Sequence, residues 1–285
     1  MARSTFIPRG DTIVHWVSPD GKHLPINGPS ARDYIMGEGP EGLAGVEVEY
    51  LFEAAARQHG ETYTGYTMDH NEIDFVLHVL ADSSDELRRR MAYLETQFER
   101  FRTGWLMTYS VTNGWRWVSA RRSKLSPIVE RDPGRRHEVT YEVVLVVEAP
   151  LAREADDSAY WVNESGSSKG QIALWPGDSE WHAWPQFILR GPGIFRLRWG
   201  GNDVEFPRIN SDEWVLVNTD EARPTIRCRN DQGQERNLWP EMNPGQRIPY
   251  PIRGGQVTRV DISVLSGNAS SSVWGQVAVQ HEGLV

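Results

Sequence analysis

Apolar positions between residues 83 and 103 repeat with the period of an α-helix. The stripe recurs at steps of four and three residues and consists of Leu87, Met91, Leu94, Phe98 and Phe101. Ser83 and Glu86 have the spacing of a capping box, and Gly104 follows as a C-terminal stop. This pattern predicts a helix from Ser83 to Thr103 whose apolar stripe packs on a sheet. The stripe is too short to favour a coiled coil.

Around this helix, apolar runs and alternating patterns predict strands. They cover residues 13–17, 73–80, 105–111, 115–120 and 139–147. Asn113-Gly114 separates two of these runs and favours a tight hairpin turn. Trp115 and Trp117 alternate along the second run and therefore share one face of the sheet. Strands, one helix and further strands, in that order, indicate an α+β domain over residues 1–150.

The second half of the chain reads as all β. Short apolar runs, bounded by Gly, Asn and Asp turns, cover residues 187–189, 194–199, 214–217, 225–229, 257–265 and 273–279. Such spacing is typical of a β-sandwich, which we expect over residues 171–285. Residues 151–170 are polar, small and aperiodic, so they are predicted to form a linker.

Composition excludes several classes of protein. The 285 residues include 30 Lys and Arg against 39 Asp and Glu, for a net charge of −9, and a single cysteine. An acidic chain is a poor binder of duplex nucleic acid and has no polybasic membrane anchor. Its apolar runs are strand-sized, so no membrane association is expected. Cys228 has no partner for an internal disulfide, and a buried, inert thiol is expected there.

Motifs that carry chemistry are missing from the sequence. The eight His residues lack metal-ligand spacing, and the glycine-rich run at residues 37–45 lacks the Lys-Ser/Thr ending of a phosphate loop. Carboxylates are plentiful, but no spacing singles out a glycosidase pair. We therefore predict no catalytic residue, no cofactor and no metal. A glycan-degrading enzyme with an accessory domain remains an alternative hypothesis, after the two that are given below.

Aromatic residues supply the candidate interaction sites. Trp105, Trp115, Arg116 and Trp117 are of the types enriched at protein interfaces, although a core or plain surface role is open for each. Trp181 and Trp184 are candidates for carbohydrate stacking. Their spacing of three places them on opposite faces of an extended segment, so a mainly structural role is predicted for both.

These features together resemble the distal tail proteins of siphophages, often labelled minor tail proteins in phages of actinobacteria. The capped helix follows the strand at residues 73–80, the Asn-Gly hairpin comes next, and Glu148-Ala149-Pro150 closes the first domain. Residues 176–193 then run Pro-Gly-Asp, Trp-Pro, a strand and Gly-Pro, which is similar to the start of the family's galectin-like domain. This part of the chain, with Trp175, Trp181, Trp184 and Trp199, contains more tryptophan than the family pattern.

The resemblance implies a structural protein of the virion rather than an enzyme. It implies a homo-hexameric ring at the tail tip or baseplate, joining the tail tube protein to the tail hub, the tape-measure protein and the receptor-binding apparatus. The first domain would build the ring and channel wall, and the galectin-like domain would project outward. Assembly would take place in the host bacterial cytoplasm. An acidic channel would let DNA pass without specific binding. The alternative is a carbohydrate-binding module, formed by the second domain, for attachment to the host surface.

Overall fold

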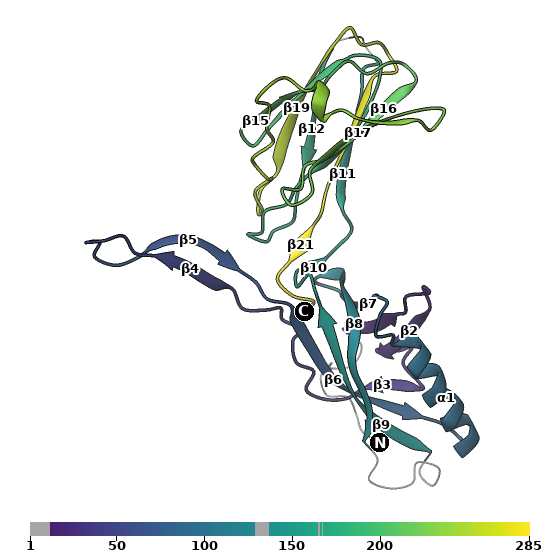
Figure 1. Cartoon of the computed structure of the whole chain (residues 1–285). Coiled ribbons are helices and arrows are strands. Elements are labelled where there is room, and N and C mark those ends of the chain that lie inside the picture. The colour runs from purple at the N-terminus through teal and green to yellow at the C-terminus, as the bar shows by residue number, and fades with distance from the viewer. Residues whose placement is uncertain (1–11, 129–136, 165, 167) are drawn as a thin grey trace. The chain divides into compact units, whose positions relative to one another are not determined.

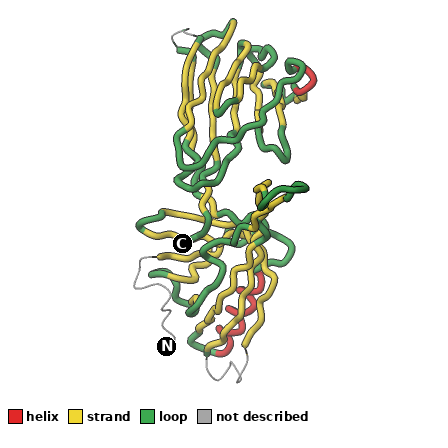
Figure 2. Tube along the Cα trace, turned by 90° about the vertical axis from the view of Figure 1, so that its left-hand side faces the viewer, coloured by secondary structure: helices red, strands yellow, loops and turns green. Residues whose placement is uncertain are grey.

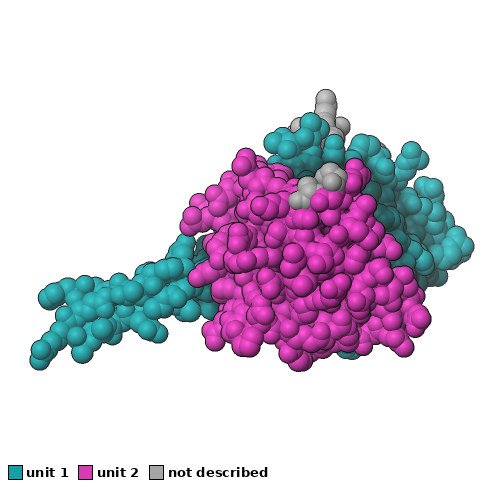
Figure 3. Space-filling model, turned by 90° about the horizontal axis from the view of Figure 1, so that it is seen from above, with its two compact units in different colours: residues 1–154, 282–285 teal, residues 155–281 magenta. Residues whose placement is uncertain are grey.

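The chain forms two compact units. The computed structural model describes residues 12–128, 137–164, 166 and 168–285 (Figure 1). Unit 1 comprises Met1–Glu154 with Glu282–Val285, and unit 2 comprises Ala155–His281; Figure 3 colours them separately. The chain therefore leaves unit 1 once and returns to it for its last residues. Among the described residues there is a single α-helix, and strands predominate, which confirms the predicted mainly β fold with one helix.

Unit 1 is built on one antiparallel sheet. Its order is β2-β1-β7-β8-β9-β6-β3. The bounds are β1 Thr12–Val17, β2 His23–Asn27, β3 Tyr34–Met36, β6 Asn71–Leu80, β7 Gly104–Ser110, β8 Gly114–Ile128 and β9 Glu138–Val147, and the two-residue β10, Ala152–Arg153, pairs with β8. The long β8 pairs with β7 over its first half and with β9 over its second half. This strand thereby joins the two parts of the sheet.

Helix α1, Ser84–Gln97, lies along this sheet (Figure 2). The Ser83 hydroxyl accepts from the Glu86 amide at 3.2 Å, as the capping box predicts, and Leu87 and Leu94 are buried while Met91 packs against the same core. The helix ends six residues before the predicted Thr103. Phe101 is 90% exposed, so its assignment to the buried stripe is wrong.

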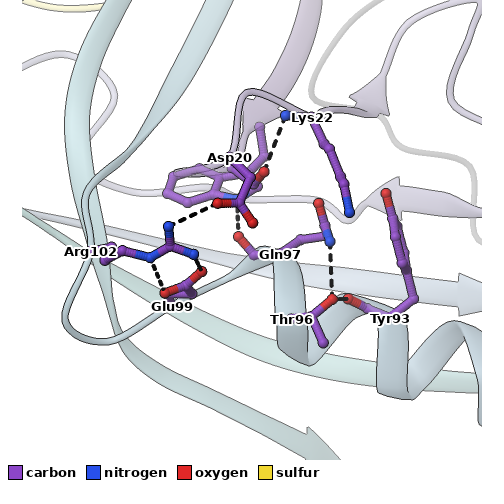
Figure 4. Close-up of polar contacts among 9 residues, drawn as sticks. Asp20, Lys22, Tyr93, Thr96, Gln97, Glu99 and Arg102 are labelled. Atoms are coloured by element: carbon purple, nitrogen blue, oxygen red, sulfur yellow. Dashed lines mark hydrogen bonds and ion pairs between the residues drawn. The ribbon is translucent and has the colours of Figure 1, made fainter.

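Tertiary contacts at the end of α1 explain this early stop. The Trp16 indole donates to the Gln97 carbonyl at 2.7 Å, and the Phe98 ring stacks on Trp16 at 4.6 Å between centroids. Phe98 is extended, and its amide still reaches the Leu94 carbonyl. Beyond it, Arg102 pairs with Glu99 and with Asp20, the latter at 2.8 Å, which ties the next segment to the β1–β2 turn (Figure 4).

The β7–β8 hairpin is present at the predicted place, with a longer loop than a two-residue turn. Ser110 pairs with Gly114, which leaves Val111, Thr112 and Asn113 in the loop. Gly114 has φ of +68°, and its lack of a Cβ makes this left-handed conformation accessible. Asn-Gly therefore marks the turn, with Asn113 as the last loop residue and Gly114 as the first residue of β8.

Unit 2 is a sandwich of two antiparallel sheets. The six-stranded sheet has the order β11-β20-β13-β16-β17-β18 and the four-stranded sheet β12-β19-β14-β15. The bounds are β11 Asp157–Val162, β12 Lys169–Leu174, β13 Gln186–Arg190, β14 Ile194–Trp199, β15 Asn202–Glu205, β16 Glu213–Asn218, β17 Thr225–Asn230, β18 Glu235–Asn237, β19 Thr258–Leu265 and β20 Ser272–Val277, with a 3-10 turn at Trp239–Glu241 and the short β21 at Gln280–His281. Phe187, Phe195 and Phe206 are among its fully buried side chains.

The stretch predicted as a linker, residues 151–170, contains β10, β11 and the start of β12. β11 pairs with β20 over its whole length, and the change of unit falls at Glu154–Ala155. The strand is hard to see in the sequence because only alternate positions face the core and its outward positions are mixed in character. Independent folding of the two units stays a prediction.

Candidate interaction surfaces

Hairpin β4–β5 is an arm of unit 1 that forms a separate two-stranded sheet. Among the described residues, β4, Glu49–Glu53, and β5, Thr62–Thr67, pair only with each other, and the hairpin runs out from its unit (Figure 1). Its aromatic side chains face solvent: Tyr50 is 61% exposed, Phe52 53% and Tyr63 52%. The Tyr63 ring meets Tyr50 and Phe52 edge-on, each at 6.0 Å between centroids. The arm thus presents a continuous aromatic surface.

The base of the arm is firmly held in unit 1. Before β4, the Gly42 carbonyl accepts from the Asn71 side chain at 2.7 Å, and Glu41 and Asp74 exchange backbone hydrogen bonds. The Leu43 carbonyl accepts from the amide of Leu284 at 2.8 Å. A two-stranded hairpin is marginal by itself in water, so a fixed base with an exposed aromatic tip is typical of a segment that pairs with another surface.

A second surface lies on the outward face of β1, β7 and β8. Register places Trp105, Tyr109, Trp115 and Trp117 on this one face, as the alternation predicts for Trp115 and Trp117. The Trp115 ring contacts Tyr109 at 5.2 Å and His15 at 5.7 Å. Burial, and then the neighbouring His23, lower the pKa of His15. Trp105 and Trp115 remain exposed, so three of the four interface candidates come together here.

Arg116, the fourth candidate, points to the opposite face of the sheet. Its guanidinium donates to the Gly283 carbonyl at 3.3 Å, and the neighbouring Thr108 hydroxyl donates to the Leu284 carbonyl at 2.7 Å. Burial lowers the pKa of Arg116, and Glu154 partly offsets this effect. The structure therefore gives Arg116 an intramolecular task, which is to hold the returning C-terminal segment on unit 1.

A third surface is acidic and lies on the outward face of β6 and β9. Glu72, Asp74 and Glu142 occupy it together with an ion pair, Lys124–Glu142 at 2.6 Å, and a contact between His78 and Glu138 at 3.5 Å. Burial first, and then Glu72, Glu41 and Glu142, raise the pKa of Asp74. An upward shift of a carboxyl pKa by its neighbours indicates a locally negative potential.

Trp181 and Trp184 lie in an irregular segment of unit 2. Between them, Ala183 is buried and exchanges backbone hydrogen bonds with Ile252 at 2.9 and 2.8 Å. Both tryptophans are half-buried beside this bridge, so neither is among the large exposed side chains. The segment does not present them as a pair on an open sheet face, and their structural role stays a prediction.

The remaining sequence expectations concern metal ligands, the single cysteine and membrane spans. No group of three or more His, Cys, Asp or Glu side chains there could hold a metal ion. Cys228 is buried, as predicted, and burial followed by Glu213 raises the pKa of its thiol. Within the same residues, no helix has the length and apolar character needed to span a bilayer.

Comparison with solved structures finds proteins of similar fold, whereas the two comparisons by sequence find none. No protein-family model matches the chain, and no curated protein matches it in sequence. Among solved structures, it is similar to the Dit protein (gp 19.1) of phage SPP1, described as a paradigm of the hub adsorption apparatus in phages that infect Gram-positive bacteria. The TM-score is 0.59 at 12% identity, over 93% of this chain and 98% of that one.

The phage P2 baseplate in its activated conformation gives similar results. A chain of the Ca-bound baseplate matches with a TM-score of 0.50 and a chain of the Sr-bound baseplate with 0.51, each at 10% identity over 95% of this chain and 98% of that chain. At these identities the likeness concerns the fold. The chain has the fold of the siphophage distal tail proteins, as its sequence resemblance predicts.

Proposed function

We propose that this protein is a structural, non-enzymatic component of a phage tail tip, in which unit 1 assembles into a hexameric ring between the tail tube and the tail hub. The observation that carries the proposal is the β4–β5 arm, with its exposed Tyr50, Phe52 and Tyr63. The fold likeness to hub and baseplate proteins supports the tail-tip setting. The number of subunits comes from the family resemblance.

The arm fits a ring because it gives each copy two different contact surfaces. A rigidly based arm that packs on the next copy makes a heterologous contact, and such contacts close into a ring when the rotation allows it. The half-exposed aromatic face around Trp105 and Trp115 is a surface of suitable chemistry to receive it. Burial of the arm's rings would remove an apolar patch that a monomer leaves in water.

The acidic outward face of β6 and β9 suits a channel wall. Glu72, Asp74 and Glu142 would repel the phosphates of transiting DNA, so the DNA would pass without specific binding. On this proposal the ring contacts the tail tube protein on one side and the hub and tape-measure proteins on the other. It is part of the virion, is assembled in the host cytoplasm and needs no cofactor or membrane. Unit 2 would be the galectin-like domain that projects outward.

The arm can be tested by replacing Tyr50, Phe52 and Tyr63 together with Ser in a phage that carries this gene. These side chains are exposed, so the purified variant should fold with the unfolding free energy of the parent. We expect virions without an intact tail tip, or no infectious particles. Phe101→Ser, which removes another exposed aromatic side chain of unit 1, is the matched control and should assemble normally.

Cryo-electron microscopy of the parent virion gives the direct readout. Density for a hexameric ring of this fold between tube and hub, with the arm on a neighbouring copy, supports the proposal. The proposal is wrong if the protein is absent from the particle or confined to peripheral fibres. Normal tails from the triple variant would contradict the role given to the arm.

A further inference from the structure

The outward face of the six-stranded sheet in unit 2 carries a row of apolar side chains. The strand register aligns Tyr160, Trp274, Ile188 and Leu216 across β11, β20, β13 and β16. Tyr160 is 64% exposed and Trp274 41%. The row crosses three strand spacings of about 4.8 Å, and so extends over roughly 14 Å. The positions before and after it on each strand face the sandwich core, and at the next outward positions only Val162 on β11 and Trp214 on β16 extend the apolar surface.

One side of this row is bordered by uncharged polar groups. Ser158, Gln276 and Gln186 occupy the next outward positions of β11, β20 and β13. The Gln276 amide donates to the Gln186 carbonyl oxygen at 3.1 Å, so the two side chains fix each other's orientation. This contact leaves the Gln276 carbonyl oxygen as an acceptor and the Gln186 amide nitrogen as a donor toward a ligand.

The other side of the row is basic on β13 and β17, whereas β11 and β20 place Val162 and Ser272 there. Arg190 stands beside Trp214 in the register, and Arg229 lies over the Trp214 ring at 5.6 Å while it pairs with Glu235. Arg227 continues the apolar row on β17. These outward positions hold three arginines and one carboxylate, in a chain whose net charge is −9. The face is therefore locally positive on an acidic protein.

The four-stranded sheet of the same sandwich shows what a plain solvated face looks like here. Most of its outward positions are polar or charged, and several are paired: Asp203 contacts Arg196 at 2.6 Å and Arg198 at 3.0 Å, and Asp261 accepts from Gln171 at 2.7 Å. Pairing of charges of this kind does not explain the exposed aromatic rings on the six-stranded sheet. The aromatic row is thus a special feature of one sheet rather than a property of the sandwich.

We propose that this face of unit 2 binds an extended polysaccharide that bears acidic groups. Exposed aromatic rings stack on the apolar faces of sugar rings, the Gln186–Gln276 pair offers a donor and an acceptor to hydroxyls, and planar guanidiniums bind carboxylate or phosphate substituents. A narrow apolar row with polar groups along most of its border matches a thin chain with hydroxyls along its edges. A protein partner of stable affinity would instead need a wider apolar centre.

This inference goes beyond the ring proposed for unit 1 and does not depend on it. The proposed polysaccharide site also differs from the carbohydrate candidates Trp181 and Trp184, because its side chains are brought to one sheet face by the strand register. The aromatic residues involved are far apart in the sequence: Tyr160 and Trp274 become neighbours only through the pairing of β11 with β20.

The test uses the full chain on an array of purified polysaccharides. The array holds neutral dextran and galactan, uronate-bearing alginate and pectin, and phosphodiester-bearing teichoic acid. We expect binding to at least one acidic polymer, and titration with that polymer should show about tenfold weaker binding for Trp274→Ala. Trp274→Phe should keep most of the affinity. Arg190→Gln should reduce the preference for acidic over neutral polymers, and the arms with uronate and phosphodiester identify the acidic group.

Leu265→Ala, which removes an exposed apolar side chain from the other sheet, is the matched control and should bind as the parent does. Near-ultraviolet circular dichroism and thermal unfolding confirm that each variant is folded. Binding to no polysaccharide, binding to neutral polymers alone, or equal loss in the control would overturn the proposal. So would a Trp274-dependent self-association or a Trp274-dependent loss from the virion without glycan binding, since either outcome assigns the face to a protein. Ring assembly is read separately, from the arm variants.

Discussion

Phe98 and Phe101 provide the sharpest test of how the sequence builds unit 1. Both belong to one apolar stripe in the sequence, but Phe98 is fully buried against Trp16 and Phe101 is 90% exposed. Burial of about 200 Å² of aromatic surface, at about 25 cal/mol per Å², is worth up to about 5 kcal/mol. Because Ala keeps part of this surface and a cavity forms, we expect Phe98→Ala to lower the free energy of unfolding by about 3–5 kcal/mol. Phe101→Ala should change it by less than about 0.5 kcal/mol.

Hydrogen exchange followed by mass spectrometry measures this difference within unit 1 itself. Peptides from α1 and β6 report the opening free energy of the helix and of the sheet beneath it, and peptides from β13 and β16 serve as an internal reference in unit 2. Equal effects of the two substitutions would refute the reasoning. So would a negligible effect of Phe98→Ala, because the helix end would then not depend on the Trp16 stack.

Three further predictions follow from unit 1. Leu94→Ala should cost about 2–5 kcal/mol of unfolding free energy in urea titration, because this side chain is fully buried; a negligible cost would place the stripe in solvent. Asp74→Asn should raise the thermal stability of the monomer at pH 7. The folded-state pKa of Asp74 lies above its unfolded value, so the wild-type protein loses stability as the pH rises and this carboxyl ionises. The gain from Asn should therefore vanish below about pH 4, and a gain that persists there would contradict the raised pKa. Deletion of Gly283–Val285 should speed hydrogen exchange at residues 41–45 and in β7, since it removes the buried Leu284; deletion of Val285 alone, an exposed residue, is the control.

The local signals in the sequence were sufficient for most elements. Capping by Ser83, the period of the helix stripe and the alternation of β9 depend on neighbours within a few residues, and the structure has each of them. The end of α1 depends on Trp16, which lies 81 residues from Gln97 in the sequence. No periodicity within the helix can report such a contact, so the stripe was predicted to continue to Phe101.

The candidate sites depended even more on long-range pairing. Alternation placed Trp115 and Trp117 on one face, but it took the register with β7 to add Trp105 and Tyr109. The arm was missed because its strands have ordinary alternating patterns, and exposure cannot be read from pattern alone. A usable signal was present: Tyr50, Phe52, Tyr63 and Tyr66 form an aromatic group between glycine- and charge-rich flanks.

The C-terminal residues pack against the base of the arm just after the chain returns from unit 2. Leu284 is buried in the core of unit 1, where its amide binds Leu43 at the base of the arm and its carbonyl accepts from Thr108. Unit 2 is therefore connected to unit 1 at both of its ends, through Glu154–Ala155 and through His281–Glu282. If unit 1 forms the proposed ring, these two covalent connections, one of them packed against the base of the arm, would carry load from unit 2 to the ring by two routes.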